Sequence, residues 1–234
     1  MDPRLSLQAA TMLRLDGQGG ILRESDPDGG PGPRLYAVGD AAGLQVWLRC
    51  GTDPAIIAAA RVLAAGATGW TDPDRLPEAA RELAELVDGE PQPSLIFTLD
   101  GVAAQTSALL SGSAEGEALV SNLARHGVPD HLAEAGFATV ADLWPPWAAW
   151  LEDGQIAALA FAARLTTHGA EVGVYTFPAW RGRGLAQRVT AAWSRHPHLA
   201  GRQLYYSCAA GNAASRRVAA KLGLARIGCG LRVG

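Results

Sequence analysis

The chain has 234 residues, of which 48% are hydrophobic and 18% are charged, and its formal net charge at pH 7 is −3. This composition is typical of a soluble globular protein with one large domain or two small ones, and the acidic balance gives no overall attraction for nucleic acid or an anionic membrane. The three scattered cysteines exclude a disulfide framework, and there is neither a signal pattern in the first 15 residues nor an apolar run of about 18 residues. We therefore expect a cytoplasmic protein without a metal site.

The N-terminal 93 residues predict a small α/β region of unknown role. Residues 17–33 are rich in glycine, proline and aspartate, which is typical of a loop. Asp53 and Pro54 are a typical helix N-cap and first helical residue. The predicted elements are strands at 35–38 and 44–48 and helices at 54–65 and 77–87. Gly89 to Pro93 indicate a linker, so we divide the chain into residues 1–93 and a second domain of residues 94–234.

The second domain predicts the order strand, two helices, three strands, helix, strand, helix, strand. Asp153-Gly154, between two apolar runs, is a strong hairpin signal. Gly223 stands where a C-cap glycine is expected. The predicted elements are strands at 94–99, 147–151, 155–165, 171–176, 203–208 and 226–233 and helices at 115–126, 129–135, 185–193 and 212–222.

The most informative segment is the glycine-rich turn Arg181-Gly182-Arg183-Gly184-Leu185-Ala186, which lies between a predicted strand and a predicted helix. The first turn of a helix has unpaired backbone N–H groups and partial positive charge. Glycines let the backbone approach a ligand closely. The turn therefore predicts a site for a phosphate or pyrophosphate.

This turn resembles the acetyl-coenzyme A site of the GNAT (GCN5-related) N-acyltransferases, whose signature is [RQ]-x-x-G-x-[GA]. Arg181, Gly184 and Ala186 occupy its fixed positions, and the Thr-x-Pro before it is similar to the FR47-like branch. A second stretch, Asn212-Ala213-Ala214-Ser215 followed by a helix ending in Lys221-Leu222-Gly223, resembles the N-x-x-S and K-L-G-F pattern of the same family. The resemblance implies an α/β fold with a mixed, mostly antiparallel sheet, splayed strands and flanking helices. The N-terminal region could then be a degenerate second half of the same kind.

The resemblance implies acetyl-CoA as co-substrate. Its pyrophosphate would accept hydrogen bonds from the amides of residues 183–186, and its pantetheine arm would run beside the strand that ends at Thr176. The binding residues implied in this way are Tyr175, Thr176, Arg181, Gly182, Arg183, Gly184, Leu185, Ala186, Asn212 and Ser215. Amides near Tyr175 or Thr176 would stabilise the oxyanion.

Acyl transfer to an amine depends most on a base, because an alkyl ammonium has a pKa near ~10.4 whereas the leaving thiol has one near ~8.5. Glu171 is the best candidate, and Tyr175 and His168 are alternatives. In a regular strand Glu171 and Thr176 face opposite sides, and a bulge would change that. Many relatives have a tyrosine acid seven residues after the asparagine, where this chain has Ala219, so Ser215 is the candidate acid.

These observations predict an N-acetyltransferase that moves an acetyl group from acetyl-CoA to a primary amine of a small molecule or peptide. The alternative is a coenzyme A-binding module without catalysis. A helix-turn-helix reading of 214–224 lacks a second helix, and His196 and His198 read as solvated surface rather than metal ligands. Trp144, Trp147 and Trp150 read as core or as an apolar acceptor pocket, and Cys208 as a buried apolar residue. A homodimer is compatible with the sequence.

Overall fold

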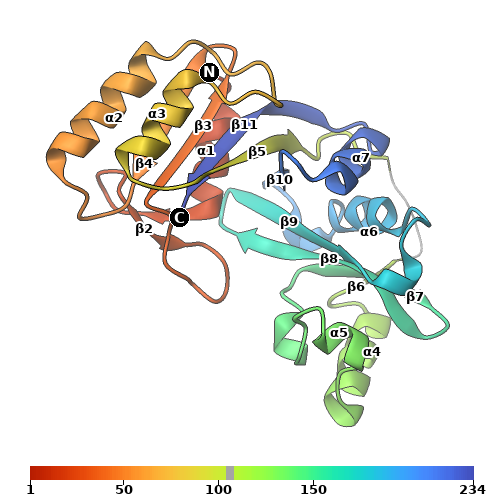
Figure 1. Cartoon of the computed structure of the whole chain (residues 1–234). Helices are drawn as coiled ribbons and strands as arrows, with labels where there is room; N and C mark the ends of the chain where they lie inside the picture. Colours follow the sequence, from red (N-terminus) through yellow and green to blue (C-terminus); the bar gives the residue numbers. More distant parts are fainter. Residues whose placement is uncertain (104–107) are drawn as a thin grey trace.

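A nine-stranded sheet links the N-terminal and C-terminal parts of the chain in the computed structural model, which describes residues 1–103 and 108–234 (Figure 1). Its strand order is β4-β3-β11-β5-β10-β9-β8-β7-β6, and β1 and β2 form a separate hairpin. The strands are β1 Leu13–Leu15, β2 Ile21–Glu24, β3 Leu35–Asp40, β4 Gly43–Leu48, β5 Pro91–Thr98, β6 Leu109–Leu110, β7 Trp147–Glu152, β8 Gln155–Leu165, β9 Gly169–Thr176, β10 Gln203–Ala209 and β11 Ala225–Val233.

Helices cover both faces of this sheet. The largest core cluster lies between one face and the helices α2, α3, α6 and α7, and two smaller clusters lie on the other face under α1 and beside α4 and α5. The helices are α1 Pro3–Met12, α2 Pro54–Gly66, α3 Glu78–Leu86, α4 Ala114–His126, α5 Asp130–Ala133, α6 Leu185–Trp193 and α7 Ala213–Lys221. The predicted α/β class with a mostly antiparallel sheet and flanking helices is therefore confirmed.

The local signals read from the sequence act as expected. The Asp53 carboxylate accepts a hydrogen bond from the N–H of Ala55, and Pro54 begins α2. Asp153 and Gly154 have φ values of 50° and 76°, and these left-handed conformations close the β7–β8 hairpin. None of the helices in the described part of the chain has the length and apolarity that a bilayer-spanning segment needs.

β9 and β10 are paired in parallel, and their pairing is short compared with the length of either strand. β9 and β10 pair only from Gly169 and Gln203 to Glu171 and Tyr205. Beyond these residues β9 continues to Thr176 and β10 to Ala209 with no register between them. The two strands therefore splay apart, as the family resemblance implied, and leave free backbone groups at the opening.

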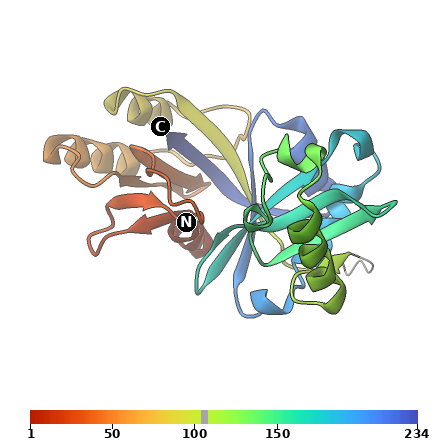
Figure 2. The same ribbon diagram turned by 90° about the horizontal axis from the view of Figure 1, so that it is seen from below.

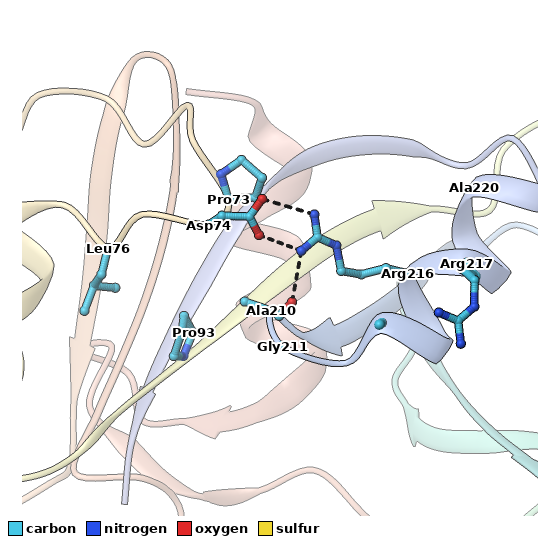
Figure 3. Close-up of a pocket in the computed structure, with 10 residues that line it drawn as sticks. Pro73, Asp74, Leu76, Pro93, Ala210, Gly211, Arg216, Arg217 and Ala220 are labelled. Carbon is cyan, nitrogen blue, oxygen red and sulfur yellow. Dashed lines mark hydrogen bonds and ion pairs between the residues drawn. The ribbon is translucent and has the colours of Figure 1, made fainter.

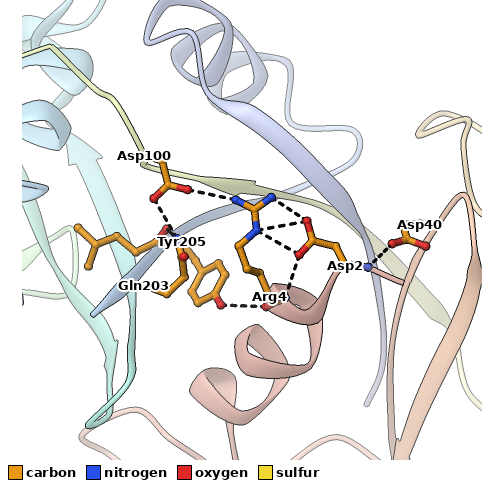
Figure 4. Close-up of polar contacts among 7 residues, drawn as sticks. Asp2, Arg4, Asp40, Asp100, Gln203 and Tyr205 are labelled. Carbon is orange, nitrogen blue, oxygen red and sulfur yellow. Dashed lines mark hydrogen bonds and ion pairs between the residues drawn. The ribbon is translucent and has the colours of Figure 1, made fainter. Parts of the chain in front are cut away.

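α1 is held over this region of the sheet by apolar and polar contacts. Leu5 and Ala9 are fully buried. At its N-terminus, Arg4 bridges Asp2 at 2.7 Å and Asp100 at 3.1 Å, and the hydroxyl of Tyr205 in β10 donates to the carbonyl of Arg4 at 2.8 Å (Figure 4). The N-terminal helix is therefore fixed directly to the strand that forms one side of the opening.

Some predictions for the N-terminal region are wrong. The stretch taken as a loop contains β2, because Ile21 is fully buried beneath α1. The proposed linker is partly strand, because β5 begins at Pro91 and pairs there with Val233. The sheet is continuous across residues 93 and 94, although the division into two domains stays a prediction. The sequence analysis also proposed no element for α1.

Candidate active site

A cavity of about 470 Å³ lies between the end of β9, the start of α6 and the start of α7. Nine of the ten residues implied as coenzyme ligands line it: Tyr175, Thr176, Arg181, Gly182, Gly184, Leu185, Ala186, Asn212 and Ser215. The tenth, Arg183, is exposed in the turn, so that only its backbone remains a candidate ligand. Residues more than 25 positions apart in the sequence are thus gathered around one cavity.

The glycine-rich turn presents its backbone to solvent. Gly184 has a φ of 79° and immediately precedes α6, a conformation that side-chain-bearing residues rarely adopt. The N–H groups of Gly182, Arg183 and Gly184 donate no hydrogen bond within the described residues. The N–H groups of Leu185 and Ala186 belong to the first turn of α6, where no carbonyl of the helix can accept them. Five consecutive amides are therefore available to an anion.

The side chains around the cavity add positive charge and further polar groups to these amides. Arg181, Arg217 and Lys221 line it, and no carboxylate does within the described part of the chain. Two buried oxygens of its lining residues, Thr176 Oγ1 and Gln187 Oε1, have no hydrogen-bond partner. Buried polar atoms without partners are uncommon in folded proteins, and here they fit a ligand that offers both donors and acceptors. The cavity therefore suits the phosphates and the amide-containing arm of coenzyme A.

The end of β9 adds two amides that face the opening. Phe177 N–H donates to the carbonyl of Ala157 in β8 at 3.1 Å. Because successive residues of a strand point their N–H groups in opposite directions, those of Val174 and Thr176 face away from β8, toward the opening. The Thr176 carbonyl accepts from Arg181 Nε at 3.1 Å. Of the two expected oxyanion donors, the N–H of Thr176 thus has the right direction and that of Tyr175 points to β8.

At the start of α7, the side chain of Asn212 has a capping role. Its Oδ1 accepts from the N–H of Ser215 at 3.0 Å, which leaves the amide nitrogen for a ligand. Ala219, at the position of the absent tyrosine, is buried in the core. The sequence analysis missed Tyr206, which comes from β10, lines the same cavity and donates from its hydroxyl to the carbonyl of Ser215 at 3.3 Å. Burial raises the pKa of Tyr206 to about 12, so it stays protonated and can serve as a donor.

Glu171 lies at the point where β9 and β10 separate, on the face opposite the cavity. Its Oε1 accepts a hydrogen bond of 2.5 Å from the backbone N–H of Ser207. Ser207 lies in β10, beyond the last residue pair that joins β10 to β9. The Oε2 of Glu171 is buried without a partner, and the side chain is 4% exposed. Burial raises the pKa of the Glu171 carboxyl to about 7, against the opposing effect of the Ser207 hydrogen bonds. A carboxyl with such a pKa is suited to accept a proton near neutral pH.

α1 contributes to the surroundings of this carboxyl. Gln8 is fully buried, accepts from the Tyr36 hydroxyl at 2.9 Å and lies with its Nε2 3.4 Å from Ser207 Oγ. The bulge that we considered for β9 is instead in β8, between Ala162 and Arg164. β9 itself is regular, so that Glu171 and Thr176 do face opposite sides of the sheet.

The remaining candidates are less suited to catalysis. Tyr175 lines the cavity, but its ring packs against Phe137 and Phe177. His168 is exposed in the turn before β9, at the end where the strands are still paired. Cys208 is buried, as predicted, and burial raises its pKa. His196 is also buried, with Nε2 at 2.9 Å from the carbonyl of Ser111, so the interpretation of this residue as surface was wrong.

The structure also shows where the three tryptophans named in the sequence analysis lie. Trp147 belongs to the core, whereas Trp150 is half-buried beneath the guanidinium of Arg188 at 4.7 Å. Trp144 is half-buried against Phe161.

The structure does not support the helix-turn-helix alternative. After α7 the chain turns at Gly223 and enters β11, so no recognition helix follows.

A larger cavity, of about 650 Å³, lies on the other side of α7 (Figure 3). Arg216 forms a bidentate contact with Asp74 there, at 2.5 and 3.3 Å, and so connects α7 to the N-terminal region. Since Asp74 neutralises the nearest cation, this cavity has less attraction for phosphate than the one between α6 and α7. We therefore place the candidate site in the smaller cavity.

The sequence of this region matches a known family. The model of the family GNAT acetyltransferase covers residues 148–228, which include the splayed strands, the glycine-rich turn and α7. This match covers about a third of the chain and marks residues 148–228 as similar to the GNAT acetyltransferases. No curated protein sequence matches the chain. The FR47-like subgroup stays a prediction.

Solved structures similar to the chain include GNAT proteins. A putative GNAT acetyltransferase of Novosphingobium aromaticivorans is 24% identical over 62% of this chain and 64% of its own, with a TM-score of 0.43. A GNAT acetyltransferase of Colwellia psychrerythraea is 16% identical over 82% and 80%, with a TM-score of 0.45. A GCN5-related N-acetyltransferase of Sphaerobacter thermophilus is 14% identical over 88% and 77%, with a TM-score of 0.44. This chain spans less than two thirds of the Novosphingobium protein.

Proposed function

We propose that the protein is an N-acetyltransferase that moves an acetyl group from acetyl-CoA to a primary amine of a small molecule or peptide. The observation that carries the proposal is the opening between β9 and β10, which has an amide-rich cationic cavity on one face and the Glu171 carboxyl on the other. The family match over residues 148–228 supports acetyl transfer in general, and the cavity supports coenzyme A as the carrier.

In this proposal the amides of residues 182–186 and the cations Arg217 and Lys221 bind the phosphates. Hydrogen bonds to charged acceptors each contribute about 1.5–3 kcal/mol, and the helix dipole contributes about 0.3–1 kcal/mol. Backbone geometry therefore supplies more of the affinity than any single side chain. No metal enters the proposed reaction.

The reaction is a direct attack. The amine nitrogen forms a bond to the thioester carbonyl carbon, and the N–H groups of Val174 and Thr176 stabilise the oxyanion that develops there. Glu171 accepts the proton that the amine loses, directly or through a water molecule. The carbon–sulfur bond then breaks and the thiolate takes up a proton, for which the cavity offers the hydroxyl groups of Ser215 and Tyr206.

The test has two stages. Calorimetric titration with acetyl-CoA measures binding, and a thiol-release assay over a panel of amines measures transfer. Binding with amine-dependent thiol release is the expected result. Binding without thiol release for any amine would favour the alternative, a coenzyme A-binding module, and absence of binding would refute both. The cytoplasmic location and a homodimer remain predictions.

A further inference from the structure

The candidate base is almost closed off from solvent, although the proposed reaction requires it to take a proton from a bound amine. Glu171 is 4% exposed and lies opposite Tyr205 on the face of the sheet that α1 covers. Figure 2 shows α1 (red, next to the N label) beside the turquoise hairpin end of β8 and β9, and Glu171 is the third residue of β9 from that end. An amine therefore needs an intermediate group to pass its proton to this carboxyl.

Ser207 lies between Glu171 and solvent. It is two residues past Tyr205, the last residue of β10 that pairs with β9. Alternate residues of a strand point to the same face, so Ser207 shares the face of Tyr205, whose hydroxyl contacts the backbone of α1. Tyr205 is fully buried, Ser207 is half-buried, and Ala209, two residues further along this face, is exposed. Access from solvent to this face of β10 therefore begins at Ser207.

Ser207 also contacts Glu171 directly. Its backbone N–H donates to Oε1 of Glu171 at 2.5 Å, whereas Oε2 has no hydrogen-bond partner. The Ser207 hydroxyl lowers the pKa of the Glu171 carboxyl, as a donor close to the charged form does. The hydroxyl oxygen lies 3.4 Å from Nε2 of Gln8, a group that can only donate. Since Gln8 supplies a hydrogen to this oxygen, the hydrogen of the serine is left for the carboxylate.

The two tyrosine hydroxyls near Glu171 donate to other groups. The Tyr36 hydroxyl donates to Oε1 of Gln8 at 2.9 Å, and the Tyr205 hydroxyl donates to a backbone carbonyl of α1 at 2.8 Å. Burial raises the pKa of both tyrosines, so they keep their protons near neutral pH. Within the part of the chain that the structure describes, Ser207 is therefore the hydroxyl beside the carboxyl that is both half-exposed and free to donate.

Consecutive residues of β10 reach the two faces of the opening. Tyr206 points away from α1 and lines the coenzyme cavity, whereas Ser207 lies on the face of Glu171. The N–H groups of Val174 and Thr176 face the opening from β9, where the thioester carbonyl would bind. An amine that attacks this carbonyl from the face opposite the coenzyme cavity approaches on the side of Ser207.

We propose that Ser207 is a catalytic residue that relays the proton from the acceptor amine to Glu171, in place of direct transfer or a bridging water. As the neutral amine bonds to the thioester carbonyl carbon, its proton moves to Oγ of Ser207 while the hydroxyl proton of the serine moves to the carboxylate. The serine is neutral before and after this step, and Glu171 becomes the neutral acid. The reverse relay returns the proton to solvent after the amide has left. The inference rests on the proposed function for the identity of the proton donor.

The first experiment removes the hydroxyl but keeps the backbone N–H that Glu171 accepts. S207A is expected to lower kcat about tenfold or more with an unchanged Kd for acetyl-CoA, and S207T, which keeps a hydroxyl, should restore most of the rate. S94A is the matched control, because Ser94 is half-buried on the same face of β5 and β10 separates it from β9. Thermal melting verifies that each variant is folded. An unchanged kcat in folded S207A would overturn the proposal.

The pH profile separates a relay from a purely electrostatic role. Loss of the hydroxyl should raise the pKa of Glu171 in either case. Arg164 of β8 acts on the same pKa but is present in every variant. If only the pKa mattered, the kcat of S207A would recover fully at pH 9, where the carboxyl is ionised, and that result would overturn the proposal. A lost relay leaves kcat low at pH 9, which is the expected result.

The number of protons in flight gives an independent measurement. In mixtures of H2O and D2O, the dependence of kcat on the deuterium fraction should be curved for the unmodified protein, because two protons move together, and linear for S207A. A linear dependence in both proteins would contradict the relay. Mass spectrometry that detects an acetyl group on Ser207 during turnover would also contradict it, because the serine would then be a nucleophile.

An infrared titration tests the contact without turnover, with E171Q used to identify the carboxyl band. S207A should raise the pKa of this carboxyl, and an unchanged pKa would overturn the relay whatever the activity. If the pKa rises but no amine is acetylated, the contact stands, the proposed function fails and the relay fails with it. If amines are acetylated and S207A keeps its kcat, only the relay fails.

Discussion

The two sides of the opening between β9 and β10 are built in different ways. The coenzyme cavity is formed largely by backbone groups of two short segments, the turn at 181–186 and the start of α7. The Glu171 side is formed by individual side chains from distant parts of the chain, with Gln8 from α1 and Tyr36 from β3. The first is open to solvent and cationic, whereas the second is buried and contains an ionisable group with an unpartnered oxygen.

This difference predicts different sensitivities. A backbone site tolerates most side-chain changes but not a change of backbone conformation. A buried side-chain site depends on each polar partner, because a lost hydrogen bond leaves another group unsatisfied. Substitutions on the two sides should therefore affect binding and turnover separately.

The sharpest test of the comparison is Glu171→Gln. The amide keeps the shape and an acceptor for the Ser207 N–H but cannot accept a proton, so kcat is expected to fall about 10²–10³-fold, within the usual range for a general base. The Kd for acetyl-CoA, measured by calorimetry, should not change. A variant with unchanged kcat would show that Glu171 only holds the strands apart.

The same substitution should alter two pH dependences. Since the carboxyl must be ionised to act as a base, the kcat/KM of the unmodified protein is expected to rise through pH 7 and to level off above it, in line with a pKa of about 7. The folded state binds this proton more tightly than the unfolded state, whose pKa is near 4.5. Stability from this group is therefore complete below pH 4.5 and is lost as the pH rises through 7. Chemical denaturation should show that the E171Q variant lacks this loss.

Gly184→Val tests the side of the opening that holds the coenzyme cavity. Valine at a φ of 79° is strained and would rearrange the turn, so the Kd for acetyl-CoA should rise at least ~100-fold, equivalent to about 3 kcal/mol. The control is Gly201→Val, because Gly201 has a φ of 78° with open space around it and is not part of the cavity. Both variants should lose similar thermal stability, and only the first should lose affinity. Equal affinities would place the coenzyme elsewhere.

A smaller effect is expected for Gln8→Leu, which tests the contribution of α1. The polar side chain of Gln8 lowers the pKa of Glu171, so its loss should raise that pKa further, and kcat at pH 7 should fall several-fold and recover at pH 9. Ser6→Ala is the control, because Ser6 lies on the same helix and contacts Gln45 of β4 instead. A pH profile identical to that of the unmodified protein would mean that Gln8 has only a packing role.

The smallest effect should come from single cations of the cavity. Arg217→Gln is expected to weaken acetyl-CoA binding about three- to fivefold, in line with about 1 kcal/mol for an exposed charge pair, and less at high salt. Its neighbour Arg216, which pairs with Asp74, should leave the Kd unchanged when replaced by glutamine. If R216Q weakens binding more than R217Q, the larger cavity takes part in the site.

The two sides of the opening also differ in how much of each could be predicted from the sequence. The turn at Gly184 and the cap at Asn212 are local signals, and nine of the ten binding residues that the resemblance implied line the cavity. Their role in binding the coenzyme stays a prediction. Tyr206 and Lys221 were missed because their place in the cavity depends on how β10 and α7 pack. The burial of Glu171 was not predicted either, because it depends on α1, for which the sequence analysis proposed no element although Asp2 and Pro3 form the same cap signal as Asp53 and Pro54. β6, with two residues, is too short for any periodicity.

The position of β11 has a consequence for the biosynthesis of the protein. This strand, residues 225–233, lies between β3 and β5, which are synthesised more than 120 residues earlier. On the ribosome, the hairpin of β3 and β4 and the strand β5 must wait with unpaired edges until β11 emerges. Such edges can pair with other chains, so the window between their synthesis and the arrival of β11 is when the nascent polypeptide is most exposed to aggregation and to chaperones.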